Sequence, residues 1–506
     1  MIFTHKNLNI FLGPPGTGKT TTLLNTIDQE LQNGVDPNKI GFISFTRKAT
    51  LEAISRACDK FKFEPEQLPY FRTIHSMAFM GLGMTRSQVM SRSHYREFGK
   101  LTHTSITGMD MSEEGIVTAG AAIGDRMLFC DHLARIRMID LYDQWRRLAD
   151  DQVKWELQSQ FSRNLVKFKR ERALLDFTDM LERYPEEGFA PNIEVLIVDE
   201  AQDLSALQWQ VVKYVSRGAK RVYVAGDDDQ AIYRWAGADV EQFIGLRGNV
   251  SVLSHSYRLP KLVHATAMGI LKNIRHRREK VFSPREIVGG LSYHNSFDEI
   301  DLSTGSWLIL ARNNYQLEPL EEHCRVNGYS YESKNFSLDG SNMLTAIRSW
   351  EHLRKGNTLM GTLVKKVYSY MGAGVSIKKG YKNITGMKDD KEYSLEELKK
   401  DWGLVTDKIW HESLNLIDAR DHAYILSALK RGESLTKTPR IKISTIHGAK
   451  GGEADNVMLL TDMSAKTYEG FKKNPDDEHR VFYVGVTRSR QNLHIVSPSG
   501  GSGYVI

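Results

Sequence analysis

One stretch of eight residues has the types and spacing needed to hold a polyphosphate: Gly13, Pro14, Pro15, Gly16, Thr17, Gly18, Lys19 and Thr20. The stretch fits the pattern G-x-x-x-x-G-K-[ST] of a phosphate-binding loop. Its glycines let backbone N–H groups turn inward around the phosphates. The lysine can then reach the β- and γ-phosphates, and the threonine hydroxyl can bind Mg²⁺. The stretch therefore predicts a binding site for a nucleoside triphosphate.

A second group of chemically capable residues follows the segment 194–198, which reads as a buried strand. Asp199 can hold Mg²⁺, and Glu200 can orient and deprotonate an attacking water molecule. A lone Asp-Glu pair is usually a solvated strand end. Following four buried aliphatic residues and accompanied by a phosphate loop, the pair instead indicates catalysis. The two segments together predict an enzyme that hydrolyses nucleoside triphosphates.

Short apolar runs that end in polar residues must position these groups. In the first half of the chain we expect strands at 8–12, 40–45, 194–198 and 221–225, with a helix after the phosphate loop. A second series begins near residue 251, with strands expected at 252–253, 307–311, 441–445, 457–460 and 481–484. Strands that alternate with helices predict an α/β fold with doubly wound parallel sheets and ligands at the strand carboxyl ends.

Two segments interrupt this alternation. Residues 77–172 show an irregular helical pattern, and residues 334–436 are lysine-rich with a glycine turn at 372–374. We interpret both as insertions that lie outside the sheets.

Composition sets broad limits on what the protein can be. The net charge is +6, from 68 basic and 62 acidic residues, which permits nucleic acid as a partner without requiring it. The three cysteines, Cys58, Cys130 and Cys324, have no metal-binding spacing and fit a reducing compartment. No apolar run approaches the length of a membrane span, and the phosphate loop begins too early for a signal peptide. We therefore expect a cytoplasmic protein that makes no membrane contact.

Further motifs follow the phosphate loop in a fixed order. They are Ser44-Phe45-Thr46-Arg47-Lys48-Ala49, Thr73-Ile74-His75-Ser76, Asp199-Glu200-Ala201-Gln202-Asp203, Gly226-Asp227-Asp228-Asp229-Gln230-Ala231-Ile232-Tyr233-Arg234-Trp235, Tyr257-Arg258, Thr445-Ile446-His447-Gly448-Ala449-Lys450-Gly451-Gly452-Glu453 and Tyr483-Val484-Gly485-Val486-Thr487-Arg488. In this order they resemble the motifs of superfamily 1A DNA helicases, the UvrD/Rep/PcrA group. The resemblance runs from residue 13 to residue 490.

The resemblance implies two RecA-like P-loop NTPase motor domains, each with a mainly helical insertion. The expected boundaries are 1–80 and 173–250 for motor domain 1A, 81–172 for insertion 1B, 251–333 and 437–506 for motor domain 2A, and 334–436 for a reduced insertion 2B. The implied activity is ATP-dependent 3′–5′ DNA unwinding. Its partners would be single-stranded DNA and junctions between single-stranded and duplex DNA. A translocase that strips proteins from single strands and a non-motor ATP-dependent assembly factor remain alternatives.

The resemblance also assigns roles to single residues at the nucleotide. Glu200 would activate water, and Gln230 would sense the γ-phosphate. Arg258 and Arg488 would be arginine fingers supplied by the second motor domain. ATP would further contact Tyr257 through adenine stacking and Glu453 through the ribose, and Mg²⁺ would be held by Thr20 and Asp199.

Five residues fall where the group contacts DNA: Phe45, His75, Tyr233, Trp235 and His447. Aromatic stacking suits tracking that ignores base sequence. Each of the five also has a structural interpretation, as a core aromatic residue or a hydrogen-bonded histidine. The basic segment 272–280 is expected to be a solvated helix face, with phosphate contact as the alternative.

Three features depart from the group's pattern. The residues before Gly13 include no glutamine to read adenine, so we expect relaxed base selectivity. Ala236 stands where an arginine is common, and the second insertion is short. The pathway and any replication or repair partner stay open.

Overall fold

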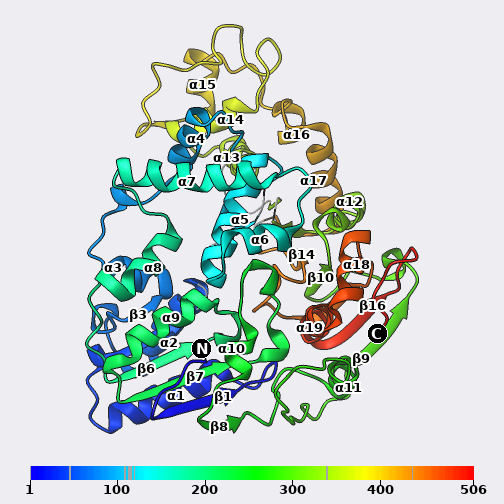
Figure 1. The fold of residues 1–506 in the computed structure, drawn as a ribbon. Coiled ribbons are helices and arrows are strands. Elements are labelled where there is room, and N and C mark those ends of the chain that lie inside the picture. The colour runs from blue at the N-terminus through cyan, green and yellow to red at the C-terminus, as the bar shows by residue number, and fades with distance from the viewer. Residues whose placement is uncertain are drawn as a thin grey trace. The chain divides into compact units, whose positions relative to one another are not determined.

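A computed structural model describes residues 2–44, 47–107, 110–111, 117–118, 120–334, 336–337, 340–435 and 437–506 (Figure 1). Its contacts divide the chain into two compact units. The first unit comprises residues 1–288 and 473–483, and the second comprises residues 289–472 and 484–506. The chain therefore returns to the first unit for one short segment late in the sequence. Residues 251–288, which the sequence assigns to the second motor domain, group here with the first unit.

The first unit is built on a six-stranded sheet of order β3-β2-β6-β7-β1-β8. Its strands are β1 (Leu8–Leu12), β2 (Ile40–Ser44), β3 (Phe71–Thr73), β6 (Val195–Asp199), β7 (Arg221–Gly226) and β8 (Asn249–Val252). Every pairing within the sheet is parallel. The predicted α/β class with a doubly wound parallel sheet is confirmed, and the predicted apolar runs form four of its strands.

Side-chain alternation along β6 places two helical layers against this sheet. Val195 and Ile197 join the core formed with α1 (Lys19–Gln32) and α2 (Arg47–Phe61). Leu196 and Val198 point to the other face and join a second core. That core includes residues of α3 (Ile74–Gly81), α5 (Ile123–Arg137), α8 (Phe177–Glu187) and α9 (Ala206–Val215). A strand buried on both faces explains the uninterrupted apolar run in the sequence.

The segment expected to be a helical insertion is mainly helical. It contains α4 (Arg92–Leu101), α5, α6 (Leu141–Leu148), α7 (Trp155–Glu171) and a short antiparallel pair, β4 (Asp110–Met111) and β5 (Val117–Thr118). The first unit also includes α10 (Val240–Ile244) and α11 (Lys261–Leu271).

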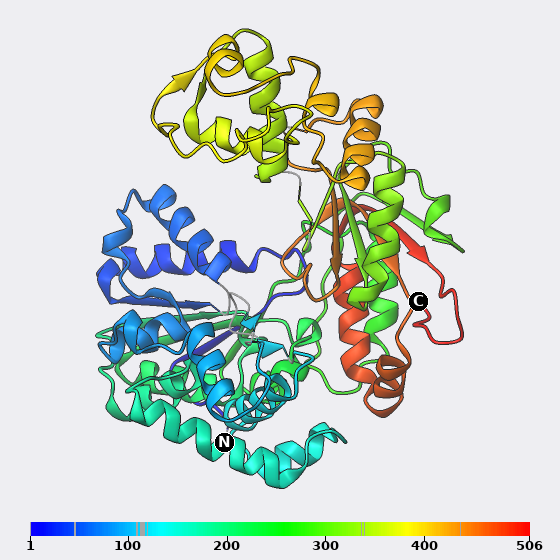
Figure 2. The same ribbon diagram turned by 90° about the horizontal axis from the view of Figure 1, so that it is seen from above.

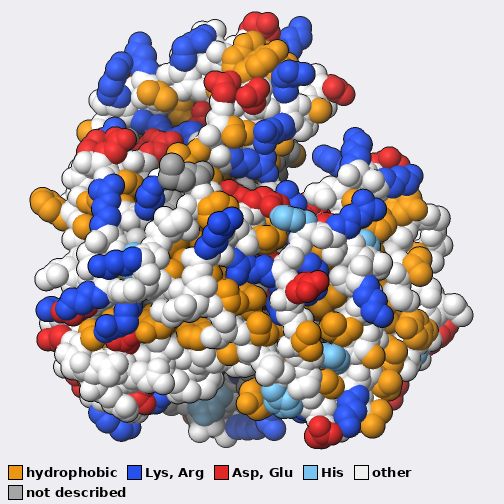
Figure 3. All heavy atoms as spheres, turned by 60° about the horizontal axis from the view of Figure 1, so that its bottom comes forward, with side chains coloured by type: hydrophobic (Ala, Val, Ile, Leu, Met, Phe, Trp, Pro, Cys, Tyr) orange, Lys and Arg blue, Asp and Glu red, His pale blue; other side chains and the backbone are white. Residues whose placement is uncertain are grey.

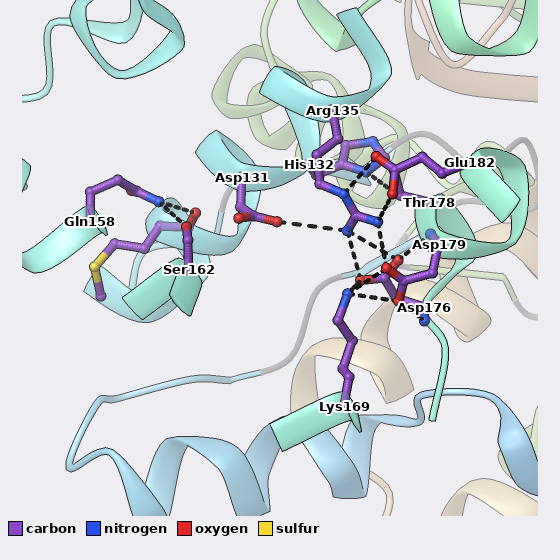
Figure 4. A network of polar contacts seen from close by, with 11 residues as sticks. Asp131, His132, Arg135, Gln158, Ser162, Lys169, Asp176, Thr178, Asp179 and Glu182 are labelled. Atoms are coloured by element: carbon purple, nitrogen blue, oxygen red, sulfur yellow. Dashed lines mark hydrogen bonds and ion pairs between the residues drawn. The ribbon is translucent and has the colours of Figure 1, made fainter. Parts of the chain in front are cut away.

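A buried charge network ties the insertion helices to α8 (Figure 4). Lys169 on α7 donates to Asp176 at 2.6 Å and to Asp179 at 2.7 Å, and its side chain is only 6% exposed. Arg135 on α5 contacts the same two carboxylates and Glu182. Because Asp176 also caps the start of α8, the network holds three helices in register.

The second unit contains another parallel six-stranded sheet, of order β11-β14-β10-β15-β16-β9 (Figure 2). Its strands are β9 (Gly290–His294), β10 (Trp307–Ala311), β11 (Tyr331–Ser333), β14 (Ile441–Thr445), β15 (Ala454–Leu460) and β16 (Ser489–Val496). The helices α12 (Leu317–Val326) and α18 (Ala465–Lys473) also belong to this unit.

Residues 340–435 lie in the segment expected to be the second insertion. They contain α13 (Asn342–Arg354), α14 (Gly361–Ser369), α15 (Leu395–Asp401), α16 (Trp410–Ser413), α17 (Ala419–Arg431) and a pair of short strands, β12 (Leu359–Met360) and β13 (Glu392–Tyr393). Trp350 on α13 and Tyr424 on α17 share one hydrophobic core with Trp307 and Ile309 of β10. The insertion is therefore packed as a continuation of the second unit.

The strand predicted at 481–484 is wrong. These residues lie in the helix α19 (Pro475–Val486), and the strand follows as β16. All four residues of this run are buried: Val481, Phe482, Tyr483 and Val484. The sequence therefore has no polar position here that would reveal the period of a helix. A short continuous apolar run fits a buried strand and a buried helix equally well.

The described helices include none that is both long and apolar enough to cross a membrane. On the face drawn in Figure 3, basic side chains are scattered among acidic, apolar and neutral ones. That distribution agrees with the modest net charge of +6.

Candidate functional site

The phosphate loop joins β1 to α1 and has the backbone that its glycines predict. Gly16 and Gly18 have φ angles of 72° and 80°, which L side chains rarely adopt. The Thr17 hydroxyl donates to the carbonyl of Pro14 at 2.8 Å and closes the loop on itself. Helix α1 begins at Lys19, so its N-terminal amides point toward the loop, where an anion is favoured.

Lys19 lies across this loop. Its Nζ donates to the carbonyl of Gly13 at 3.1 Å and lies 3.4 Å from Glu200 Oε1. A Cβ added at Gly13 would sit 2.0 Å from Lys19 Cγ, so the side chain needs glycine there to cross the backbone. The structure therefore brings the predicted phosphate ligand and the predicted base side by side.

Asp199 ends β6, opposite Ser44 of β2, and is 4% exposed. Burial, together with the neighbouring charge of Glu200, raises the pKa of Asp199, while Lys19 opposes the rise. A cation would stabilise the negative charge of a carboxylate that is buried beside another carboxylate. Mg²⁺ is usually bound through one or two carboxylates together with phosphate oxygens, so Asp199 and the Thr20 hydroxyl are a chemically suitable donor set.

Glu200 has an unusual backbone. Its φ of 51° and ψ of 39° place a non-glycine residue in the left-handed region. Gln202 Nε2 donates to Glu200 Oε2 at 2.6 Å, and Lys19 faces the other oxygen. Strained backbone held by surrounding contacts is typical of functional sites, which supports a catalytic role for this carboxylate.

Gln230 belongs to the same network. It is 5% exposed, and its Nε2 donates to Asp227 Oδ2 at 2.7 Å. The backbone N–H of Asp227 donates to Gln202 Oε1 at 3.0 Å. A hydrogen-bonded path therefore runs from Glu200 through Gln202 and Asp227 to Gln230. The sequence alone predicts no role for the two connecting residues, although both lie inside the motifs named above.

The segment 256–258 is pinned against the phosphate loop. The N–H of Tyr257 donates to the carbonyl of Gly16 at 2.8 Å, and the Ser256 hydroxyl donates to Pro15 at 2.7 Å. A Cβ added at Gly16 would lie 2.3 Å from Arg258 Cβ. Arg258 therefore contacts the loop within the first unit, whereas the resemblance expects it from the second motor domain. Tyr257 is 71% exposed and offers its ring as a stacking face.

In the second unit, Arg488 follows α19 and is 2% exposed. Its Nε donates to the carbonyl of Val484 at 2.9 Å, and its Nη1 donates to that of Gly452 at 3.5 Å. Glu453 is exposed, and its Oε1 lies 3.5 Å from Arg490 Nη1. The structure thus brings Arg488 to the turn that carries Glu453, and His447 lies half-buried in the same unit.

The predicted DNA residues differ in exposure. Trp235 is 41% exposed, whereas Tyr233 is 9% exposed and packs inside the first unit. His75 is half-buried against the edge of Phe177, and burial lowers its pKa to about 4. Phe45 lies outside the described residues. Exposure therefore favours Trp235 as a stacking residue.

Two family models match the chain. The model of the UvrD/REP helicase N-terminal domain matches residues 2–250, and that of the UvrD-like helicase C-terminal domain matches residues 151–499. The second match alone covers more than half of the sequence.

Curated relatives agree at low identity. The chain is 25% identical over 363 residues to ATP-dependent DNA helicase Rep of Buchnera aphidicola subsp. Baizongia pistaciae, covering 65% of this chain and 50% of that protein. It is 26% identical over 299 residues to ATP-dependent DNA helicase PcrA of Staphylococcus aureus (strain Mu50), covering 54% and 39%. Rep of the Schizaphis graminum subspecies is 20% identical, covering 96% of the chain and 90% of that protein.

The alignments with the first two relatives thus span about half or less of their length. The phosphate loop and the strand-end carboxylates have the geometry of a nucleotide site. The two family models together cover every motif from Gly13 to Arg488. The chain belongs to the UvrD-like helicase family of ATP-hydrolysing enzymes.

Proposed function

We propose that this protein is an ATP-dependent 3′–5′ DNA helicase that translocates on single-stranded DNA and unwinds duplexes. One observation carries the nucleotide part of the proposal. Lys19, Glu200 and Gln230 belong to one connected network at the carboxyl ends of the parallel strands of the first unit. A parallel sheet binds its ligands at that edge.

Each residue has a defined task in this proposal. Lys19 leaves the carbonyl of Gly13 to bind the β- and γ-phosphates of ATP. Glu200 accepts a proton from the attacking water, and Gln230 contacts the γ-phosphate. Thr20 and Asp199 hold Mg²⁺, which supplies charge stabilisation on the phosphates when bound. Arg258 and Arg488 stabilise charge that develops on the transferring phosphoryl group.

DNA binding is proposed for Trp235, together with Phe45, His75, Tyr233 and His447. The exposed indole of Trp235 can stack on any base, so the contact supports movement along DNA without sequence preference. We also propose that the motor domains and insertions have the boundaries given above. The proposed substrates include junctions between single-stranded and duplex DNA.

A strand-displacement assay tests the polarity. A duplex with a 3′ single-stranded tail should be unwound in the presence of ATP and Mg²⁺, while blunt and 5′-tailed duplexes of the same sequence should stay intact. Glu200→Gln protein serves as the control for ATP-driven unwinding. Efficient unwinding from the 5′ tail alone would contradict the proposal.

A second candidate is a translocase that removes bound proteins from single strands and unwinds little. Displacement of streptavidin from a biotinylated single strand, without displacement of a paired strand, would select it. ATP turnover that single-stranded DNA leaves unchanged would instead favour a non-motor assembly factor.

Trp235→Ala should weaken binding of single-stranded DNA by about 1–3 kcal/mol, because one base loses its stacking partner. The loss should be similar for poly-dT and mixed sequences, as the contact is to a π-face. Fluorescence anisotropy measures the affinities. Trp235→Phe should retain part of the affinity.

Phe189→Ala is the matched control, because that ring is 85% exposed in the same unit but lies outside the motifs. It should leave DNA affinity unchanged. If Trp235→Ala kept its affinity and lost thermal stability instead, Trp235 would be a packing residue.

A further inference from the structure

The segment 272–280 is not the solvated helix face that the sequence predicts. Helix α11 ends at Leu271, and the segment continues without helical structure. Lys280, at the end of the segment, and Phe282 beyond it are buried, while Val281 between them is 83% exposed. The lysine therefore points into the first unit, and no charge pattern in the sequence distinguishes it from its exposed neighbours.

The Lys280 ammonium lies among three consecutive carboxylates. Its Nζ is 3.0 Å from Asp227 Oδ1, 2.5 Å from Asp228 Oδ1 and 2.9 Å from Asp229 Oδ2, and all four side chains are fully buried. Burial alone would lower the pKa of Lys280, but the three aspartates outweigh that effect and raise it. The three carboxylates therefore favour the charged ammonium.

Other groups complete the cluster around this turn. Arg277 binds Asp229 in bidentate fashion at 2.8 and 2.6 Å, and the N–H of Arg278 donates to Asp228 Oδ2 at 2.7 Å. From α19, the buried Arg480 donates to the carbonyl of Asp228 at 2.9 Å. A largely buried set of charges of this size has to be both paired and hydrogen-bonded, since buried charges are otherwise strongly unfavourable.

Asp227 connects this cluster to the catalytic network. One of its carboxylate oxygens accepts from Lys280, and the other accepts from Gln230 Nε2 at 2.7 Å. Its N–H holds Gln202, which in turn holds Glu200. Because the side-chain nitrogen of Gln230 is bound to Asp227, the side-chain oxygen of Gln230 lies on the other side of its amide group. The ammonium of Lys280 thus holds the carboxylate of Asp227, and this carboxylate orients the amide of Gln230.

We propose that Lys280 is a positioning residue for ATP hydrolysis: through Asp227 it orients Gln230 for the reacting phosphate. The inference rests on the role proposed above for Gln230. Lys280 itself is buried, and the proposal gives it no contact with nucleotide or DNA. Without it, Asp227 loses its charge partner, and Gln230 samples orientations that do not serve the reaction.

Lys280→Met should lower the kcat of basal ATP hydrolysis about 10- to 100-fold, the range seen when outer partners of metal ligands are removed. The Kd of a fluorescent ATP analogue should change by less than about threefold, because the phosphate loop is intact. Asp227→Asn, which keeps the shape and removes the charge, should reproduce the loss. Activity is measured on protein shown to be folded by circular dichroism.

A second variant guards against misfolding. Lys280→Met combined with Asp228→Asn removes one charge of each sign and leaves the side chains of Asp227 and Gln230 unaltered. This protein should fold and still show the lowered kcat.

Lys169→Met is the matched control, because it removes another buried lysine from two carboxylates in the network of Figure 4. It should lower the melting temperature and leave basal kcat unchanged. A loss of kcat as large as that of Lys280→Met would mean that the effect is general destabilisation.

A double-mutant cycle with Gln230→Ala completes the test. If Lys280 acts through Gln230, Lys280→Met should add little to the loss already caused by Gln230→Ala. Independent losses that multiply, or a folded Lys280→Met enzyme with parental kcat, would overturn the proposal. If Gln230→Ala alone kept parental kcat, the role proposed for Gln230 would fail first. Because the readout is basal ATPase, absence of unwinding has no bearing on the result.

Discussion

Arg488→Ala should lower the DNA-stimulated kcat of ATP hydrolysis by about 10³-fold, the largest effect expected of any substitution proposed here. An arginine finger stabilises charge that appears only as the phosphoryl group is transferred. The affinity for single-stranded DNA should change little, because no DNA contact is assigned to this side chain. Steady-state ATPase with and without poly-dT, and anisotropy with the same DNA, measure the two quantities.

Two further variants separate catalysis from folding. Arg488 also bonds the carbonyl of Val484 near the end of α19, so the alanine variant should lose some thermal stability. Arg488→Lys keeps the charge but lacks the planar fork, and we expect it to remain strongly impaired. Arg420→Ala removes an arginine that is 57% exposed on α17 and should be neutral. An unchanged stimulated rate in Arg488→Ala would remove the finger assignment.

Glu200→Gln should lower kcat by about 10²-fold or more while leaving ATP binding intact. The substitution keeps the shape of the side chain and removes the basic oxygen that accepts the proton of water. Lys19→Ala should behave differently, because it removes a phosphate contact and weakens binding as well as turnover. Equilibrium binding of a fluorescent ATP analogue and steady-state kcat distinguish the two patterns.

Glu194→Gln is the matched control for this prediction. Glu194 precedes the same strand, β6, at its opposite end and pairs with Lys39 and Lys220 on the surface. Its loss should not affect turnover. Near-normal kcat in Glu200→Gln would show that another group activates the water.

The parallel sheets were predictable because their strands are buried on both faces. Runs such as 195–198 and 307–311 are apolar at every position and end in polar or charged residues, a combination with few structural explanations. The phosphate loop was predictable for a different reason, since its glycines adopt backbone angles that few other residues tolerate.

The errors come from residues whose environment is set by distant parts of the chain. The run 481–484 is apolar because α19 is buried on all sides there, and four residues do not reveal a period. Lys280 is indistinguishable in sequence from a surface lysine. Only the folding of 272–280 against three aspartates, about fifty residues away, defines its role. The connecting residues Gln202 and Asp227 were missed because a motif gives positions and not hydrogen bonds.

The division of the chain has a consequence for its synthesis. The first unit contains residues 473–483, including Arg480, which holds the turn at Asp228. A ribosome that has finished residue 288 must add roughly 200 more residues before that arginine emerges, which takes roughly 10–40 s at common elongation rates. During this interval the nascent first unit has its phosphate loop and its three buried aspartates but lacks one of their anchors. Complete assembly of the nucleotide site therefore waits until the segment that carries Arg480 has been synthesised.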